Sequence, residues 1–267
     1  MGDKKPIFVL GVGAQKAGTT TLHSVLNKIP GANFGEYKEY HYWTTALGKN
    51  QGENLGKFWS EQQKEFHHWL VTDEEAYCRY FSNIIERGAR ITGDITPAYA
   101  SLTQQDFSRI KETIHAMGFQ IRVIFIVRDP VERCWSAQKM ALRRSTSAGL
   151  PSPSPEEIYA RFPAWYKRDG VVARTRYDVT IKALKKTFNT HELYVGVFEE
   201  LRIENQFEGL GKFLNLPENV LPKIYPVKNK TKKLALPEQL QRECKYFYQE
   251  VYSFCYREIE KTKRLWT

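Results

Sequence analysis

Apolar runs that suit buried strands alternate along the chain with segments whose apolar residues repeat at helical spacing. Four short apolar runs are expected to form strands, at 7–10, 90–95, 121–127 and 193–198. Helices are expected where apolar residues fall three or four positions apart. The clearest sets are Leu22/Val25/Leu26/Ile29, Tyr177/Ile181/Leu184/Phe188 and Leu240/Cys244/Phe247/Val251. This alternation predicts an α/β fold with three α/β/α layers, in which helices cover both faces of a central, mostly parallel sheet.

The hydrophobic pattern shows no linker or boundary of a second domain, so residues 1–267 are expected to form a single domain. Aromatic-rich sequence at 59–85 is expected to be helical, and the Ser/Pro/Gly-rich stretch at 145–155 to be a surface loop. No run approaches the ~18 apolar residues of a membrane helix, and the apolar run near the start is too short for a signal peptide. A cytoplasmic protein that does not bind membranes is therefore expected.

The four cysteines show no metal-ligand spacing. Cys244 and Cys255 are expected on one helix, where eleven residues would separate them by about 16 Å, too far for a disulfide. Four free thiols are therefore expected.

The excess of positive charge in the sequence indicates an anionic ligand. Among 267 residues, 40 Lys and Arg face 30 Asp and Glu, for a net charge of +10, while 42% hydrophobic residues exclude a disordered chain. Residues 119–150 carry a net +4 and residues 223–267 a net +6, and the rest of the chain sums to zero. Such an excess indicates nucleic acid, a membrane surface or a phosphorylated small molecule as the partner.

A glycine-containing loop follows the first expected strand and leads into a helix. Its sequence, GAQKAGTT at 13–20, combines a turn with a helix N-terminus, which together direct backbone N–H groups at a phosphate. Gly13 and Gly18 keep the spacing of a nucleoside-triphosphate loop, but Thr19 stands where that motif has lysine, and Lys16 lies inside the loop. The segment predicts a phosphate cradle; the alternative is an ordinary strand–turn–helix junction.

A second segment points to the same edge of the sheet. The run at 121–127 ends in Arg128-Asp129-Pro130, and Ser136 follows on the next expected helix. Open α/β sheets bind ligands at the carboxyl ends of their strands, and arginine and serine are suitable phosphate donors. The alternative is a surface Arg–Asp pair with a solvent-facing serine.

Together, in this order, the two segments resemble the sulfotransferase family that uses 3′-phosphoadenosine-5′-phosphosulfate (PAPS). GAQKAGTT resembles that family's loop for the 5′-phosphosulfate, and VIFIVRDPVERCWS its element for the 3′-phosphate. The segment Asn229-Lys230-Thr231 is similar to a late segment near the 3′-phosphate. Segments 35–43 and 96–99 are similar to the heparan-sulfate-type, carbohydrate-modifying branch.

The resemblance implies a role for each matched residue. Lys16 would contact the 5′-phosphate and the bridging oxygen on which charge develops as the S–O bond breaks. Glu39 would be the general base that takes the acceptor's proton, with His41 as the competing base. The scheme needs no metal. The remaining residues that would bind the donor are Ala17, Gly18, Thr19, Thr20, Arg128, Ser136, Lys230 and Lys232.

The acceptor side departs from the heparan-type pattern. Ile95 stands where those enzymes tend to have lysine, and Thr44 replaces an acidic residue. The expected reaction is therefore sulfuryl transfer from PAPS to a hydroxyl or amine of a carbohydrate or small metabolite, with adenosine 3′,5′-bisphosphate as the product and no implication of heparan sulfate.

Two other functions fit parts of the sequence. A P-loop kinase or nucleotide hydrolase would use the same loop, but the lysine is displaced and no strand ending in a Mg²⁺-binding Asp is evident. A basic nucleic-acid-binding protein would use the C-terminal charge, but no known binding motif supports it. The expected partners are therefore a small-molecule or carbohydrate acceptor and no nucleic acid.

Overall fold

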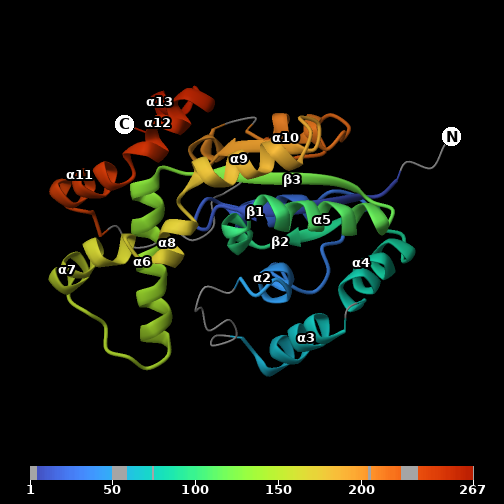
Figure 1. Cartoon of the computed structure of the whole chain (residues 1–267), viewed down its shortest axis with the longest axis horizontal. Helices are drawn as coiled ribbons and strands as arrows, with labels where there is room; N and C mark the ends of the chain where they lie inside the picture. The colour runs from blue at the N-terminus through green and yellow to red at the C-terminus, as the bar shows by residue number, and fades with distance from the viewer. Residues whose placement is uncertain (1–4, 50–58, 74, 204–205, 224–233, 267) are drawn as a thin grey trace.

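The centre of the protein is a four-stranded parallel sheet in the order β2-β1-β3-β4 (Figure 1). The computed structural model describes residues 5–49, 59–73, 75–203, 206–223 and 234–266. The four strands are those that the apolar runs predict, and each neighbouring pair is parallel. Their bounds are Ile7–Gly13 (β1), Ile91–Ile95 (β2), Gln120–Val127 (β3) and Leu193–Val197 (β4).

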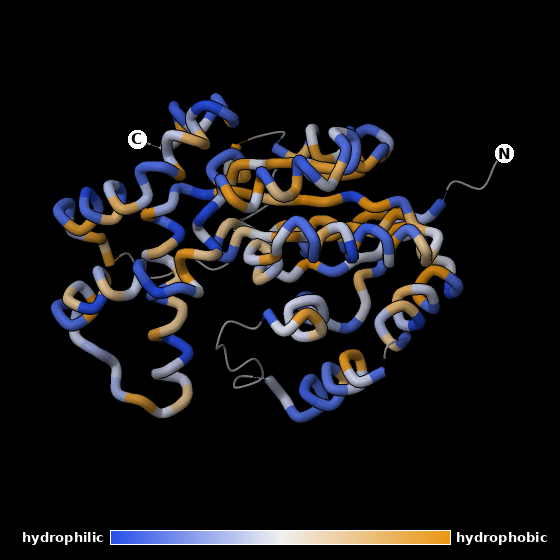
Figure 2. Tube along the Cα trace, viewed as in Figure 1, coloured by the Kyte–Doolittle hydropathy of each residue, from blue (hydrophilic) through white to orange (hydrophobic). Residues whose placement is uncertain are grey.

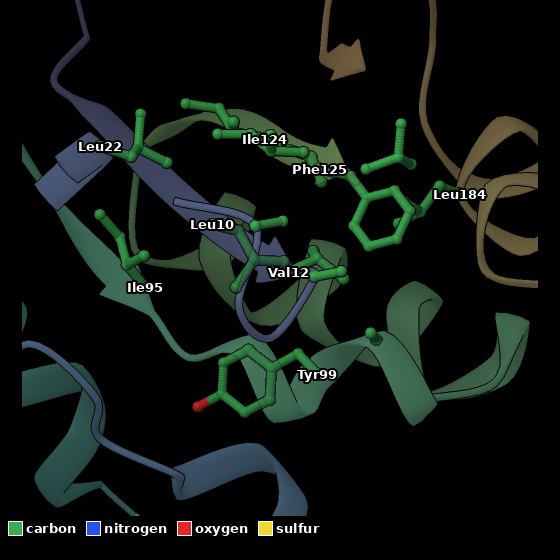
Figure 3. Close-up of a cluster of buried hydrophobic side chains, with 14 of the residues drawn as sticks. Leu10, Val12, Leu22, Ile95, Tyr99, Ile124, Phe125 and Leu184 are labelled. Carbon is green, nitrogen blue, oxygen red and sulfur yellow. The ribbon is translucent and has the colours of Figure 1, made fainter. Parts of the chain in front are cut away.

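Alternate residues of β3 pack against helices on opposite faces of the sheet. Ile124 lines a small cavity together with Leu22 of α1. Phe125 points the other way, beside Leu184 (Figure 3), and its ring centroid lies 5.8 Å from that of Tyr177 in α9. The predicted three-layer α/β/α fold is therefore confirmed. The flanking helices are α1 (Thr19–Leu26) and α10 (Glu208–Phe213) on one face, and α5 (Gln104–Ala116) and α9 (Tyr177–Thr187) on the other.

Further helices lie outside these layers, and in three segments the helix boundaries differ from the prediction. Residues 59–85 form two helices, and the helix expected through Leu240 and Val251 breaks at Tyr248 into α11 and α12. The helix α6 also extends to Ser147, which shortens the predicted loop. The bounds are Tyr42–Ala46 (α2), Glu61–Thr72 (α3), Ala76–Glu86 (α4), Pro130–Ser147 (α6), Pro155–Tyr166 (α7), Asp169–Ala173 (α8), Glu238–Phe247 (α11), Gln249–Glu258 (α12) and Thr262–Leu265 (α13), with short 3₁₀ helices η1 (Pro97–Ser101) and η2 (Phe198–Arg202).

The break at Tyr248 has a tertiary cause. The Tyr248 hydroxyl donates a hydrogen bond to the carbonyl of Tyr166 over 2.6 Å, while α11 packs on α6 and α7 and α12 packs on α9. Cys244 and Cys255 therefore lie on two helices, so the expectation of a shared helix is wrong; all four cysteines are free.

Hydrophobic residues concentrate along the strands and on the inner faces of the helices, with hydrophilic residues outside (Figure 2). In the ranges that the structure describes, no helix is long and apolar enough to cross a membrane. The single-domain organisation and the cytoplasmic location stay predictions.

The strands β1 and β2 leave no room for a side chain at Gly93, and substituting this residue tests the fold. A Cβ there would lie 2.0 Å from the carbonyl oxygen of Val9, and the φ of +155° disfavours a side chain. We expect Gly93→Ala to destabilise the protein by about 2 kcal/mol or more, as overpacking of a core does. The measurement is the urea unfolding midpoint.

The matched control is Gly209→Ala in α10, where a Cβ would meet nothing nearer than 3.5 Å. Alanine favours a helix over glycine by roughly 1 kcal/mol, so this change is expected to be neutral or stabilising. Equal midpoints for the two variants would contradict the close approach of β1 and β2.

Candidate active site

The loop between β1 and α1 lies at the carboxyl edge of the sheet and is the candidate anion cradle. Gly18 caps α1 in a left-handed conformation (φ +86°), and no side chain caps the helix. The first N–H groups of a helix have no partner within it, so they are available to a ligand. Within the loop Ala17 is buried and Lys16 also adopts a left-handed conformation (φ +69°), while Thr20 in the first turn is exposed.

Position 18 requires glycine because there is no room for a side chain, as well as because of its left-handed conformation. A Cβ at this position would lie 2.7 Å from Cδ1 of Leu201 and 3.0 Å from Cδ2 of Phe198. The loop is therefore packed tightly against η2, which fixes the entry into α1.

The two predicted phosphate segments meet in space because β1 and β3 are neighbours in the sheet. Nη1 of Arg128, at the end of β3, donates a hydrogen bond to the carbonyl of Lys16 over 2.9 Å. Its guanidinium lies 4.6 Å from the centroid of the Phe198 ring, and its Nη2 lies 3.1 Å from a carboxylate oxygen of Glu132. Ser136, one turn after Glu132 on α6, is half-buried. The structure thus brings Arg128 to the loop.

The amine of Lys16 lies in a cluster of cations. Burial, followed by the charges of Arg143, Arg128 and Arg144, lowers the pKa of Lys16 to about 8, against the opposing effect of Glu39. Within the described residues, the Lys16 amine makes no hydrogen bond or ion pair. This half-buried amine is repelled by three guanidinium groups, and the charge of Glu39 offsets the repulsion only in part, so the cluster fits a ligand with several negative charges.

Glu39 and His41 lie beside this loop, on the segment that precedes α2. The Lys38 amine donates to Oγ1 of Thr19 over 3.3 Å and also pairs with the Glu39 carboxylate. Nε2 of His41 lies 3.3 Å from the other Glu39 oxygen. Lys38 therefore connects the expected base to the start of α1.

The state of Glu39 follows from these contacts. Burial acts to raise its pKa, but the hydrogen bond with His41 and the charge of Lys38 outweigh burial and lower the pKa to about 2. The carboxylate is ionised at neutral pH and can accept a proton. With 38% of its side chain exposed, it is also accessible to a substrate.

Three site residues were missed by reasoning from the sequence. Arg143 and Arg144 act on Lys16 from the second half of α6. Their signal was present, since Ser136, Lys139 and Arg143 have the spacing of one helix face. The third, Asp94, is buried beneath the Glu39 segment and has no local sequence signal.

The aromatic residues near Glu39 differ in burial. Tyr99 belongs to the buried core (Figure 3), and Tyr40 and Trp43 are buried as well. Tyr37, Tyr42 and Trp59 are half-buried.

Two further predictions remain open. Lys230 and Lys232 lie outside the described residues. Within the described residues, no three His, Cys, Asp or Glu side chains gather as metal ligands would. Independence of metal stays a prediction.

The protein is of the α/β class, and its candidate site is a loop between a strand and a helix. Residues 6–173 match the sequence profile of the sulfotransferase family. This match covers more than half of the chain, so the protein belongs to the sulfotransferase family and is a sulfuryl-transfer enzyme. The predicted family and enzyme class are confirmed, whereas the heparan-sulfate-type branch stays a prediction.

A solved structure supports the fold. A crystal structure of a sulfotransferase from Alicyclobacillus acidocaldarius is similar, with a TM-score of 0.60 and 20% sequence identity over 96% of each chain. A sulfotransferase domain from the curacin biosynthetic pathway has a TM-score of 0.47 and 16% identity, over 93% of this chain and 97% of that one. No curated protein matches the sequence.

Proposed function

We propose that the protein transfers a sulfuryl group from PAPS to a hydroxyl or amine of a carbohydrate or small metabolite. The observation that carries the proposal is the Lys16 amine, which is repelled by three guanidinium groups and makes no ion pair within the described residues, next to the uncapped N-terminus of α1. PAPS supplies an activated sulfuryl group on a phosphate leaving group, together with a 3′-phosphate. Its negative charges match this cluster.

The donor is held by residues of both phosphate segments. The backbone of Ala17 and Gly18, with Thr19 and Thr20, binds the 5′-phosphosulfate through N–H groups and hydroxyls. Arg128 and Ser136 bind the 3′-phosphate, with Lys230 and Lys232 as further expected contacts.

Lys16 and Glu39 perform the chemistry in this proposal. The acceptor oxygen or nitrogen bonds to sulfur in line with the leaving group, while the bond from sulfur to the bridging oxygen breaks. Lys16 stabilises the negative charge that grows on that oxygen. Glu39 takes the proton that the acceptor loses, and Lys38 and His41 hold its carboxylate in place.

Adenosine 3′,5′-bisphosphate is expected to stabilise the protein more than AMP does, because only the bisphosphate carries the 3′-phosphate that Arg128 and Ser136 would bind. A ligand at a hundredfold excess over its Kd stabilises a protein by about 2.7 kcal/mol. For a chain of this size that is a rise of several degrees in Tm. Differential scanning fluorimetry with the bisphosphate, AMP and ATP measures it.

The same experiment separates the alternatives. A preference for ATP that depends on Mg²⁺ would contradict the proposal and favour a kinase. Stabilisation by an oligonucleotide with a steep salt dependence would favour a nucleic-acid-binding function. In the Ser136→Ala variant the preference for bisphosphate over AMP is expected to narrow.

A further inference from the structure

A buried carboxylate lies beneath the segment that carries Glu39 and His41. Asp94, on β2, is fully buried and accepts hydrogen bonds from three hydroxyl groups. Oγ1 of Thr96 donates to one of its oxygens over 2.6 Å. The hydroxyls of Tyr99 and Tyr77 donate to the other over 2.5 and 3.3 Å. Asp94 is thus the centre of a network, here called the Asp94 network, that consists of these four residues.

The outer side of the Asp94 network holds the backbone that follows Glu39. Oγ1 of Thr96 accepts hydrogen bonds from the backbone N–H groups of Tyr40 (3.0 Å) and His41 (3.3 Å). The Tyr99 oxygen accepts from the N–H of Trp43 over 3.4 Å. Each hydroxyl has one hydrogen, and Asp94 receives it. The oxygens are therefore left to accept, so the carboxylate sets the direction of every bond in the network.

The conformation of the segment needs such support. His41 adopts a left-handed conformation (φ +54°), which a residue with a side chain adopts only where its surroundings hold it. The N–H groups of Tyr40 and His41, bound by Thr96, lie directly after Glu39. Their positions determine where the Glu39 carboxylate and the His41 ring lie relative to Lys16.

We propose that Asp94 is a positioning residue for sulfuryl transfer, which acts through Thr96 to hold Glu39 and His41 at the reaction centre. The inference rests on the proposed function. It adds a buried residue that touches neither donor nor acceptor, and it assigns Thr96 as the link between β2 and the reacting segment.

Substitutions at Thr96 test the link. Thr96→Val keeps the side-chain shape but removes the hydroxyl, so kcat is expected to fall about tenfold to a hundredfold while the KM for PAPS changes less than about threefold, because misplaced catalytic groups slow the reaction without weakening donor binding. Thr96→Ser keeps the hydroxyl and is expected to restore most of kcat.

The chain offers a matched control on the same strand. Thr92 is fully buried on β2, and its hydroxyl has no partner among the described residues. Thr92→Val is therefore expected to leave kcat unchanged. If Thr96→Val lowers only Tm and leaves kcat at the wild-type value, the Asp94 network is purely structural and the proposal is wrong.

The pH profile tests Asp94 itself. Burial raises the pKa of Asp94 to about 6, against the hydrogen bonds from Thr96 and Tyr99. The ionisable groups that face it are Tyr77 from α4, Tyr99 from η1, and Tyr40 and His41 ahead of α2. Below pH 6 the protonated carboxyl must donate one hydrogen bond, which reverses a bond of the network. We expect kcat to fall below pH 6 in the wild type, and this fall to be absent in Asp94→Asn, whose side chain does not titrate.

Amide hydrogen exchange provides a readout that does not depend on turnover. The amides of Tyr40 and His41 are expected to exchange faster in Thr96→Val than in the wild type or Thr92→Val. Unchanged exchange would overturn the proposal even if activity falls. If the wild-type protein neither binds adenosine 3′,5′-bisphosphate nor transfers sulfuryl groups, the proposed function fails, and the exchange rates still report whether the Asp94 network holds the segment.

Discussion

Lys16→Ala is expected to lower the kcat of sulfuryl transfer by about a hundredfold or more, the usual effect of removing one group that stabilises developing charge. The amine is the cation of the phosphate loop and makes no ion pair within the described residues, so its charge is available to the leaving group. Alanine keeps a Cβ at the left-handed position (φ +69°), so the loop conformation is retained. Steady-state kinetics with PAPS measures the loss.

The matched control is Lys186→Ala, which removes an exposed lysine in the last turn of α9. Its kcat is expected to match the wild type, and both variants are expected to unfold at the wild-type temperature within a few degrees. Turnover by Lys16→Ala at the wild-type rate would contradict the role of Lys16 in catalysis.

Because the pKa of Lys16 is lowered, ligand binding is expected to change the protonation of this residue. In the free protein the pKa is about 8, so about half of the Lys16 amines are neutral at pH 8. A bound phosphate raises this pKa, because an opposite charge favours the protonated form. Binding of adenosine 3′,5′-bisphosphate at pH 8 should therefore take up about half a proton, and affinity should fall as the pH rises above 8.

Calorimetry in two buffers of different ionisation enthalpy counts the protons. The uptake is expected to disappear in Lys16→Ala and to persist in Lys186→Ala. If proton uptake is unchanged in Lys16→Ala, another group takes up the proton. The argument that Lys16 is an unpaired cation in the free protein would then be wrong.

The parts of the fold that the sequence predicts are those set by local pattern. The run at 121–127 must be buried, and its length suits a strand. Once the sheet is parallel, Arg128 and the loop that contains Lys16 have to lie at the same edge if β1 and β3 are neighbours. The hydrophobic pattern does not show that β1 and β3 are neighbours. The expectation that both phosphate segments bind one ligand does imply that they lie close together.

The parts that the sequence does not predict depend on contacts between distant residues. Thr96 meets the amides of Tyr40 and His41 across 56 and 55 positions, and neither segment contains a sign of the other. Asp94 follows a glycine in a short apolar strand and reads as an ordinary polar position. The break at Tyr248 is similar, because the hydrogen bond to Tyr166 that accompanies it spans 82 positions.

The structure explains the first of the two positively charged windows, at residues 119–150. Three of the cations in the 119–150 window, Arg128, Arg143 and Arg144, act together on Lys16. They come from one strand end and one helix, so the excess charge of that window is directed at the loop between β1 and α1. Such a field attracts a small polyanion and repels a cation from the same place.

Glu39→Gln is expected to lower kcat by about a hundredfold to ten-thousandfold, the range for loss of a general base. The amide has nearly the shape of the carboxylate but cannot take a proton. Because Lys16, Arg128 and the loop backbone are unchanged, the Kd for adenosine 3′,5′-bisphosphate is expected to stay within about threefold of the wild type. Kinetics and calorimetry on the same preparation separate the two effects.

Two comparisons decide whether Glu39 is the base. Glu36→Gln removes an exposed carboxylate from the same segment and is expected to leave kcat unchanged. His41→Asn removes the ring that lies 3.3 Å from the Glu39 carboxylate, and is expected to cost less than Glu39→Gln if His41 only orients that carboxylate. A larger loss in His41→Asn than in Glu39→Gln would assign the proton transfer to His41. In that case the carboxylate, held ionised by Lys38, would serve to orient the imidazole and to stabilise its charged form as it takes the proton.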